Sequence, residues 1–206
     1  AVEAGKALTA PRTDWAEEPL KVATWNIQYL AKKPSWKEFR LPAIYALLND
    51  YEFDIFGSQE PYLPQIEDIM EGLSDKYAWV GECTGDKESR KTHYNPIFYR
   101  KDRLELLETG TVPYSETKGT IGFGAMYARA CTWAKFMDRK TGKIFYFFNS
   151  HFDHQGVEAR EVSAEILVSA VLRIAAGFPA FMTGDFNSDE DTVPYKIILK
   201  SGFIGD

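Results

Sequence analysis

The chain has 206 residues, of which 45% are hydrophobic and 26% are charged, a composition typical of a single globular domain and not of a disordered chain. Its net charge of −6 argues against a broad basic surface that coats nucleic acid. A phosphate substrate is still compatible with this charge, because a metal ion can supply positive charge locally. No apolar run reaches the roughly 18–20 residues needed to cross a bilayer, and the 30 aromatic residues (14 Phe, 11 Tyr, 5 Trp) favour a β-rich core.

The cysteines and the N-terminal segment carry little chemistry. Cys83 and Cys131 are too few for a disulfide scaffold and lack the spacing of a zinc site, so we interpret them as free thiols. Residues 1–19 are rich in Ala, Glu and Pro and have no periodicity. We interpret them as an N-terminal tail left after processing of an exported bacterial protein, periplasmic or secreted, or as a cloning remnant. The folded domain is expected over residues 20–206.

The first half of the chain alternates predicted strands and helices. Lys21–Ile27 is strand-like, and a short turn with Ser35 and Glu38 in capping-box spacing precedes a helix that has Pro42 in its first turn. The second strand is predicted over residues 53–58. An amphipathic helix then opens at Pro64, and its apolar residues recur at helical spacing as Ile66, Ile69, Met70 and Leu73.

The second half begins with strands that have no helix between them. The strand candidates are Tyr77–Gly81, Pro96–Arg100, Arg103–Leu107 and Ala130–Met137. A turn over residues 138–143 joins the last of these to a hairpin arm over residues 144–149. A long helix is predicted from about Gly156 to Ala176, then a strand over residues 179–183 and a final helix over residues 194–200. This order predicts mixed sheets covered by helices.

Four predicted strands end in polar side chains that are suited to chemistry. These residues are Asn26; Glu60; Asn149, His151 and Asp153 around Phe152; and Asp185 and Asn187 around Phe186. Alternation on an extended backbone places the members of each group on one face. Carboxylate and amide oxygens without thiolates suit Mg²⁺ or Mn²⁺. The alternative is that these acids and amides cap loops and helices.

The ordered set of motifs resembles the endonuclease/exonuclease/phosphatase superfamily, which includes deoxyribonucleases, abasic-site endonucleases, deadenylases, inositol-polyphosphate 5-phosphatases and neutral sphingomyelinases. The motifs are Trp25-Asn26, Gln59-Glu60 and the segments 149–154 and 184–187. Segments 95–100 and 129–133 look like the bacterial, deadenylase-like branch. The resemblance implies an α/β fold, a four-layer α/β/β/α sandwich of two mixed sheets flanked by helices, with the site at one rim of the paired sheets.

The resemblance also implies a metal site and a catalytic group. Glu60 would be the principal ligand of Mg²⁺ or Mn²⁺, with Asn26 and Asp185 beside it. His151, Asp185 and Asn187 would be catalytic. His151 would hydrogen-bond to a phosphoryl oxygen, while Asp185 and Asn187 would position the attacking water and the scissile phosphate.

The same resemblance implies residues that bind the substrate. Asn26, Arg129 and Asn149 would contact it, with Arg129 as a phosphate clamp because its fork fits two oxygens; a surface ion pair is the alternative for Arg129. Asp153 could orient a neighbouring group. We leave the roles of His93 and His154 open and favour structural ones.

The expected function is that of a metal-dependent phosphoesterase, in which a metal-oriented water attacks a phosphodiester or phosphomonoester. The phosphorylated substrate could be a nucleic acid, nucleotide, sugar phosphate or lipid headgroup, and no obligate protein partner is evident. Active members of the family carry a Ser-Asp-His segment near the C-terminus that this sequence does not contain, so we expect the fold to lack its C-terminal strands. The alternative is an inactive member of the fold that binds a phosphorylated ligand or a protein.

Overall fold

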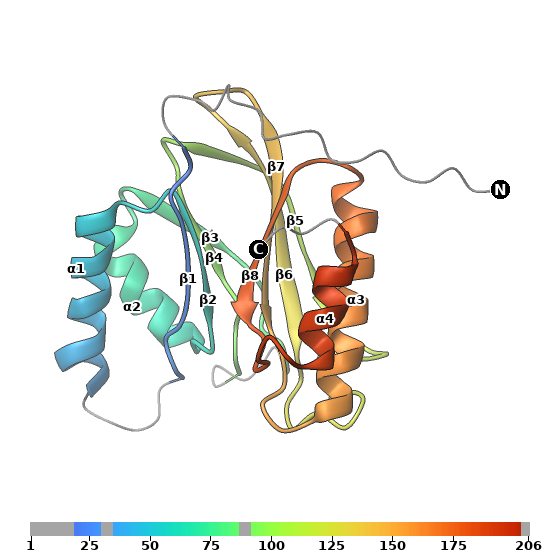
Figure 1. Ribbon diagram of the computed structural model, residues 1–206. Helices are drawn as coiled ribbons and strands as arrows, with labels where there is room; N and C mark the ends of the chain where they lie inside the picture. Colours follow the sequence, from blue (N-terminus) through green and yellow to red (C-terminus); the bar gives the residue numbers. More distant parts are fainter. Residues whose placement is uncertain (1–18, 30–34, 87–91, 203–206) are drawn as a thin grey trace.

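The protein is a sandwich of two four-stranded sheets between two pairs of helices (Figure 1). The computed structural model describes residues 19–29, 35–86 and 92–202. Nearly all of the predicted tail over residues 1–19 therefore lies outside the described residues. The four-layer α/β/β/α architecture that the motifs implied is confirmed.

The first sheet has the strand order β1-β2-β4-β3. Its strands are β1 (Val22–Asn26), β2 (Ile55–Gln59), β3 (Tyr77–Val80) and β4 (Ile97–Arg100). β1 and β2 are parallel, and the other pairs are antiparallel. The helices α1 (Leu41–Tyr51) and α2 (Leu63–Leu73) cover its outer face, on the left in Figure 1, and a single π-helical turn, Trp36–Arg40, leads into α1.

The second sheet has the strand order β5-β6-β7-β8. Its strands are β5 (Leu104–Pro113), β6 (Ala130–Asp138), β7 (Ile144–His151) and β8 (Ala180–Asp185). β5, β6 and β7 are antiparallel neighbours, whereas β7 and β8 are parallel. The helices α3 (Val157–Ala175) and α4 (Val193–Lys200) cover the outer face of this sheet (Figure 1). Within the described residues, no helix combines the length and the apolar character needed to cross a membrane.

Side-chain alternation along the strands builds three apolar layers. On β2, Ile55 packs between the two sheets while the next residue, Phe56, packs under α1 and α2. On β7, Phe147 likewise faces the other sheet and Phe148 faces α3. Because both faces of β7 are buried, its first five residues, Ile144–Phe148, form a continuous apolar run in the sequence. Both cysteines are buried free thiols, as interpreted from their number and spacing.

Two local predictions were wrong. The capping box of Ser35 and Glu38 does not form, because Ser35 already has helical backbone angles (φ −60°, ψ −18°) and its side chain makes no capping bond. The strand predicted over residues 103–107 instead extends to Pro113, with a bulge between Leu106 and Glu108. β5 lies at the edge of its sheet, where polar residues and a proline are tolerated because one side of the strand needs no ladder partner.

Candidate active site

The site lies where the carboxyl ends of four strands meet. β1 and β2 are parallel in one sheet and β7 and β8 are parallel in the other, so each pair ends at one edge of its sheet. β1 packs against β8, and β2 packs against β7 and β8, across the interface between the sheets. Asn26, Glu60, His151 and Asp185 are therefore brought to one rim, where the sequence motifs predicted that a site would be.

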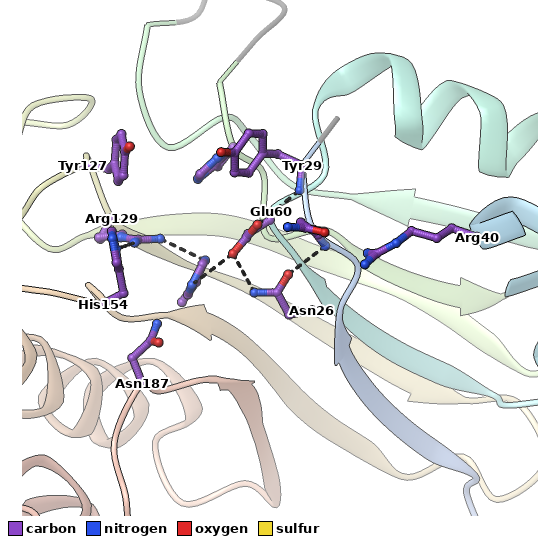
Figure 2. Close-up of a pocket in the computed structure, with 11 residues that line it drawn as sticks. Asn26, Tyr29, Arg40, Glu60, Tyr127, Arg129, His154 and Asn187 are labelled. Atoms are coloured by element: carbon purple, nitrogen blue, oxygen red, sulfur yellow. Dashed lines mark hydrogen bonds and ion pairs between the residues drawn. The ribbon is translucent and has the colours of Figure 1, made fainter. Parts of the chain in front are cut away.

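The Asn26 amide joins the two carboxylates of the site. Its Nδ2 donates to Glu60 Oε1 at 2.8 Å and to Asp185 Oδ2 at 2.9 Å. Its Oδ1 accepts the backbone N–H of Gln28 at 2.8 Å, and Glu60 Oε2 accepts that of Tyr29 at 3.1 Å. Two carboxylates that would repel each other are thus held close together by an uncharged donor. Figure 2 shows the bond from Asn26 to Glu60.

His151 faces the same two carboxylates. Its Nε2 lies 3.7 Å from Asp185 Oδ2 and 4.0 Å from Glu60 Oε1. The ring is 3% exposed, and burial together with the positive charge of Arg129 lowers the pKa of His151 well below its usual value. The imidazole is therefore neutral at pH 7.

Left-handed backbone conformations at two positions and a glycine at a third aim these side chains. Glu60 follows β2 with a left-handed backbone (φ +73°), and Asn187 follows β8 in the same region (φ +47°), which is common for Asn but not for Glu. A side chain at Gly184 would collide with the backbone carbonyl of Ser150 on β7. Only glycine fits there, directly before Asp185, and such strain often occurs at functional sites.

Asn187 lies on the pocket wall and is tied to the chain around it. Its backbone N–H donates to Asp185 Oδ1 at 3.1 Å, and its Nδ2 donates to the carbonyl of Phe152 at 3.0 Å. The first bond fixes the carboxylate of Asp185, and the second links the end of β8 to the segment that follows β7.

Asn149 does not line the pocket, although the sequence predicted that it contacts the substrate. Its side chain is fully buried between the sheets. Nδ2 donates to the carbonyls of Ser58 and Pro96 at 2.8 and 2.9 Å, and Oδ1 accepts from Gln59 Nε2 at 2.7 Å. These bonds use the polar atoms of the amide inside the protein, so Asn149 joins the two sheets below the site.

Arg129 reaches the pocket wall, but its guanidinium bonds to protein groups. Nε donates to Asp153 Oδ2 at 3.2 Å, Nη1 contacts His151 Nδ1 at 2.9 Å, and Nη2 contacts His154 Nδ1 at 3.2 Å. The alternative of a surface ion pair is excluded, because 4% of the Arg129 side chain and none of the Asp153 side chain are exposed. His154, for which a structural role was favoured, lies on the pocket wall.

The cavity above these residues measures about 460 Å³. Five of the predicted residues line it, namely Asn26, Glu60, Arg129, His151 and Asn187, together with Gln28, Tyr29, Arg40, His93, Tyr127 and His154. Asp185 lies next to this lining, hydrogen-bonded to Asn26. Figure 2 shows Arg40 extending toward Asn26 from the side opposite Arg129, and Arg40 Nη1 donates to the carbonyl of Ile27 at 2.6 Å. Sequence reasoning missed Gln28, Tyr29, Arg40 and Tyr127, because they lie outside the motifs and carry no distinctive spacing.

Aromatic rings form one wall of the cavity. The ring of His93 lies 5.3 Å from that of Tyr29 and 5.8 Å from that of Tyr127, and Tyr127 in turn stacks on His154 at 5.9 Å. Burial lowers the pKa of His93, so this imidazole is uncharged at neutral pH. A second cavity of about 280 Å³ shares the rings of His93 and Tyr127. The wall offers ring faces to a ligand on either side.

The side chains at the rim fit a hard divalent cation. Among the described residues, no group of three or more His, Cys, Asp or Glu side chains is placed to hold a metal ion. The rim nevertheless offers the carboxylates of Glu60 and Asp185 and the amide of Asn26 within hydrogen-bond distance of one another. Mg²⁺ commonly uses only one or two carboxylates and keeps several waters, so this oxygen-rich donor set suits it.

Comparison with known proteins adds an independent observation. A profile described as "Endonuclease/Exonuclease/phosphatase family" matches residues 23–205. No curated protein matches the chain in a sequence comparison.

Solved structures are similar over most of the chain. The mannosyl-6-phosphatase Bt3783 of Bacteroides thetaiotaomicron VPI-5482 is 34% identical, with a TM-score of 0.83 over 89% of this chain and 71% of that one. An endonuclease/exonuclease/phosphatase of Bacteroides vulgatus is 35% identical, with a TM-score of 0.80 over 88% and 70%. The human Nocturnin catalytic domain shares the fold at 20% identity, with a TM-score of 0.77 over 90% and 70%.

Proposed function

Because the chain belongs to the endonuclease/exonuclease/phosphatase family, whose members and structural neighbours act on phosphate esters, we propose that it is a Mg²⁺-dependent phosphatase that removes phosphate from a sugar phosphate. The observation that carries the proposal is the meeting of Glu60, Asp185 and His151 around the Asn26 amide, next to a cavity that Asn26, Glu60 and His151 line. Two carboxylates and a neutral imidazole next to an open cavity are what attack by water on phosphorus requires.

Each rim residue has a role in this proposal. Glu60, Asn26 and Asp185 would hold Mg²⁺, which when bound polarises a phosphoryl oxygen and lowers the pKa of water. Asp185, with its side chain 32% exposed, orients the water that attacks phosphorus. The ester P–O bond breaks as the new P–O bond forms, and one proton of the attacking water ends on the alcohol that leaves while the other stays with the phosphate. His151 donates a hydrogen bond to a phosphoryl oxygen, a contribution worth about 10²–10³ in rate for preorganised donors.

The shape of the pocket supports a monoester of a ring-shaped alcohol over a nucleic acid. The aromatic wall with Tyr29, His93 and Tyr127 offers flat faces on which a sugar ring can pack. The net charge of −6 does not favour binding to a long phosphate backbone. The phosphatase activity in the name of the 34% identical Bt3783 points in the same direction.

The test is release of inorganic phosphate from mannose 6-phosphate by metal-stripped protein with and without MgCl₂. We expect activity only with Mg²⁺, and Glu60→Gln should lower it at least about 10²-fold while the exposed Glu71→Gln on α2 leaves it unchanged. Equal activity in the presence of a chelator would refute the Mg²⁺ requirement. Faster cleavage of bis(p-nitrophenyl) phosphate than of the sugar phosphate would make the protein a phosphodiesterase. Binding of sugar phosphate without turnover would support the inactive alternative.

A further inference from the structure

A buried arginine contacts two of the three histidines in the chain. Arg129 reaches His151 Nδ1 with Nη1 at 2.9 Å and His154 Nδ1 with Nη2 at 3.2 Å. The third histidine, His93, contacts aromatic rings on the same wall. One guanidinium therefore bonds to two imidazoles that line the cavity.

The chemistry of these two contacts fixes where each imidazole carries its proton. A guanidinium has five N–H donors and no acceptor, so each Nδ1 that it contacts must supply the lone pair. A neutral imidazole has a single N–H, which is then at Nε2. In His151 that nitrogen faces Asp185 and Glu60 at 3.7 and 4.0 Å.

We infer that Arg129 is a positioning residue that makes Nδ1 the acceptor and Nε2 the N–H donor in both His151 and His154, and that these two N–H groups, not the guanidinium, meet the phosphoryl oxygens. The inference rests on the proposed function for what the donors bind. It also excludes His151 as the base that accepts a proton from water. Its Nε2 already carries hydrogen, and its Nδ1 lone pair is directed at Arg129.

Asp153 holds the guanidinium in place. Its Oδ2 accepts Arg129 Nε at 3.2 Å and the backbone N–H groups of Met126 and Tyr127 at 3.0 and 3.3 Å. Its Oδ1 accepts the N–H groups of Gln155 and Gly156 at 3.0 and 2.9 Å. A buried carboxylate with five donors cannot turn away, so Arg129 has a fixed anchor on the side opposite the two imidazoles.

Burial of the guanidinium is inconsistent with a direct clamp on phosphate. With 4% of its side chain exposed, Arg129 has almost no surface to present to a ligand. A phosphate bound by two guanidinium N–H groups would have to displace His151 and His154 from them. Arg129 instead fixes the orientation of the two imidazoles, and these line the cavity.

The direct test is to record long-range ¹H–¹⁵N correlation spectra of the wild-type protein with ¹⁵N-labelled histidine at neutral pH. We expect His151 and His154 to show an unprotonated Nδ1 and a protonated Nε2. His93 is the internal reference, because its ring packs against the rings of Tyr29 and Tyr127. A proton on Nδ1 of His151, or a rapid mixture of both forms, would overturn the inference. This readout needs no activity, so it is independent of the proposed phosphatase reaction.

A variant tests the consequence for catalysis. Arg129→Lys keeps a positive charge near Asp153 but cannot contact both imidazoles, so the Nε2-protonated form should no longer be the sole form of His151. We expect kcat to fall about 10²-fold, with the inhibition constant of inorganic phosphate changed less than about threefold. The exposed Arg139→Lys, which pairs with Glu105 on the surface, should change neither.

The opposite pattern would make Arg129 a phosphate clamp and overturn the inference. In that case the tautomers would be unchanged and the phosphate inhibition constant would rise with kcat preserved. Should Arg129→Lys fail to fold, the wild-type spectra decide alone. If the spectra showed protonated Nε2 in both histidines but the protein had no phosphatase activity, only the proposed function would be refuted.

Discussion

Asn149 on β7 occupies the space that the missing side chain of Gly57 leaves on β2. A Cβ at residue 57 would lie 2.6 Å from Asn149 Cγ, well inside van der Waals contact. Into this space the Asn149 amide reaches across to the first sheet and donates to the carbonyls of Ser58 and Pro96. The glycine thus permits the polar bond that fixes the two sheets relative to each other beneath the site.

Gly57→Ala should therefore destabilise the protein strongly. The added methyl group forces the Asn149 amide away from its partners in a close-packed interior, and overpacking of this kind costs about 1–3 kcal/mol in addition to about 1–3 kcal/mol for each buried polar group left unpaired. Thermal unfolding should show a Tm lower by about 4–24 °C. An unchanged Tm would contradict the close contact.

A double-mutant cycle isolates the contact between these two residues. Asn149→Ala alone should also destabilise, because it removes two buried hydrogen bonds to the carbonyls of Ser58 and Pro96. The double variant Gly57→Ala/Asn149→Ala should lose less stability than the sum of the single variants, since the methyl group then enters vacated space. Additive losses would show that the two residues do not interact.

The second prediction concerns the bridge between the carboxylates. Asn26→Asp replaces a donor to Glu60 and Asp185 with a third negative charge, so in EDTA the protein should lose about 2 kcal/mol and its Tm should fall about 4–8 °C. Mg²⁺ should raise the Tm of this variant more than that of the wild type, because the cation offsets the added charge. The exposed Asn49→Asp on α1 is the control and should respond to neither. If Mg²⁺ left the Tm of Asn26→Asp unchanged, this would argue against a cation at the rim.

The third prediction is acid sensitivity from Asp153. Burial acts to raise the pKa of this carboxyl, but hydrogen bonds from Gly156 and Gln155 and the charge of Arg129 prevail and hold the pKa well below its usual value. A carboxyl with a depressed folded-state pKa stabilises the fold above its unfolded value of about 3.9, and this stabilisation is lost as the pH falls further. At neutral pH, Asp153→Asn should cost about 3–5 kcal/mol, because Arg129 is left unpaired in the interior.

Urea unfolding between pH 6 and pH 2.5 checks this prediction. The difference in unfolding free energy between the wild type and Asp153→Asn should shrink below about pH 4. Asp138→Asn is the matched control, because Asp138 pairs with buried Arg103 far from the cavity. The wild type and Asp138→Asn should also differ less in acid, since hydrogen bonds from Arg103 lower the pKa of Asp138 despite its burial. The phosphatase activity of Asp138→Asn should stay normal. A constant difference across the pH range would show that Asp153 has an ordinary pKa.

The fourth prediction concerns substrate choice at the aromatic wall. Tyr127 stacks on His154 and lies 5.8 Å from His93, so Tyr127→Ala should raise the KM for mannose 6-phosphate about 2–10-fold, the value of one aromatic contact. The KM for glycerol phosphate, which has no ring, should change little, and Tyr127→Phe should behave as the wild type. Equal increases for both substrates would place the tyrosine at the phosphate and not at the sugar.

The positions of the strand ends could be predicted from the sequence, but the orientations of their side chains could not. Apolar runs followed by Asn26, Glu60, His151 and Asp185 predicted the rim, because parallel strands bring their carboxyl ends together. Alternation placed Asn149 and His151 on one face, yet it could not show that one would be buried between the sheets and the other would reach the cavity. The sequence predicted that Arg129 binds phosphate. It could not predict that the guanidinium is buried, because that burial depends on Asp153, a contact that only the tertiary fold provides.

The hydrogen bond between Asn26 and Asp185 spans 159 positions of the chain and links the edge strands of different sheets. Such a contact closes a very long loop, so it forms only after most of the loop entropy has been offset by other contacts. Neither sheet alone holds the rim residues in place, because each supplies half of them. During refolding, the return of catalytic turnover should therefore lag behind the return of secondary structure. The site is complete only after the two sheets have packed against each other.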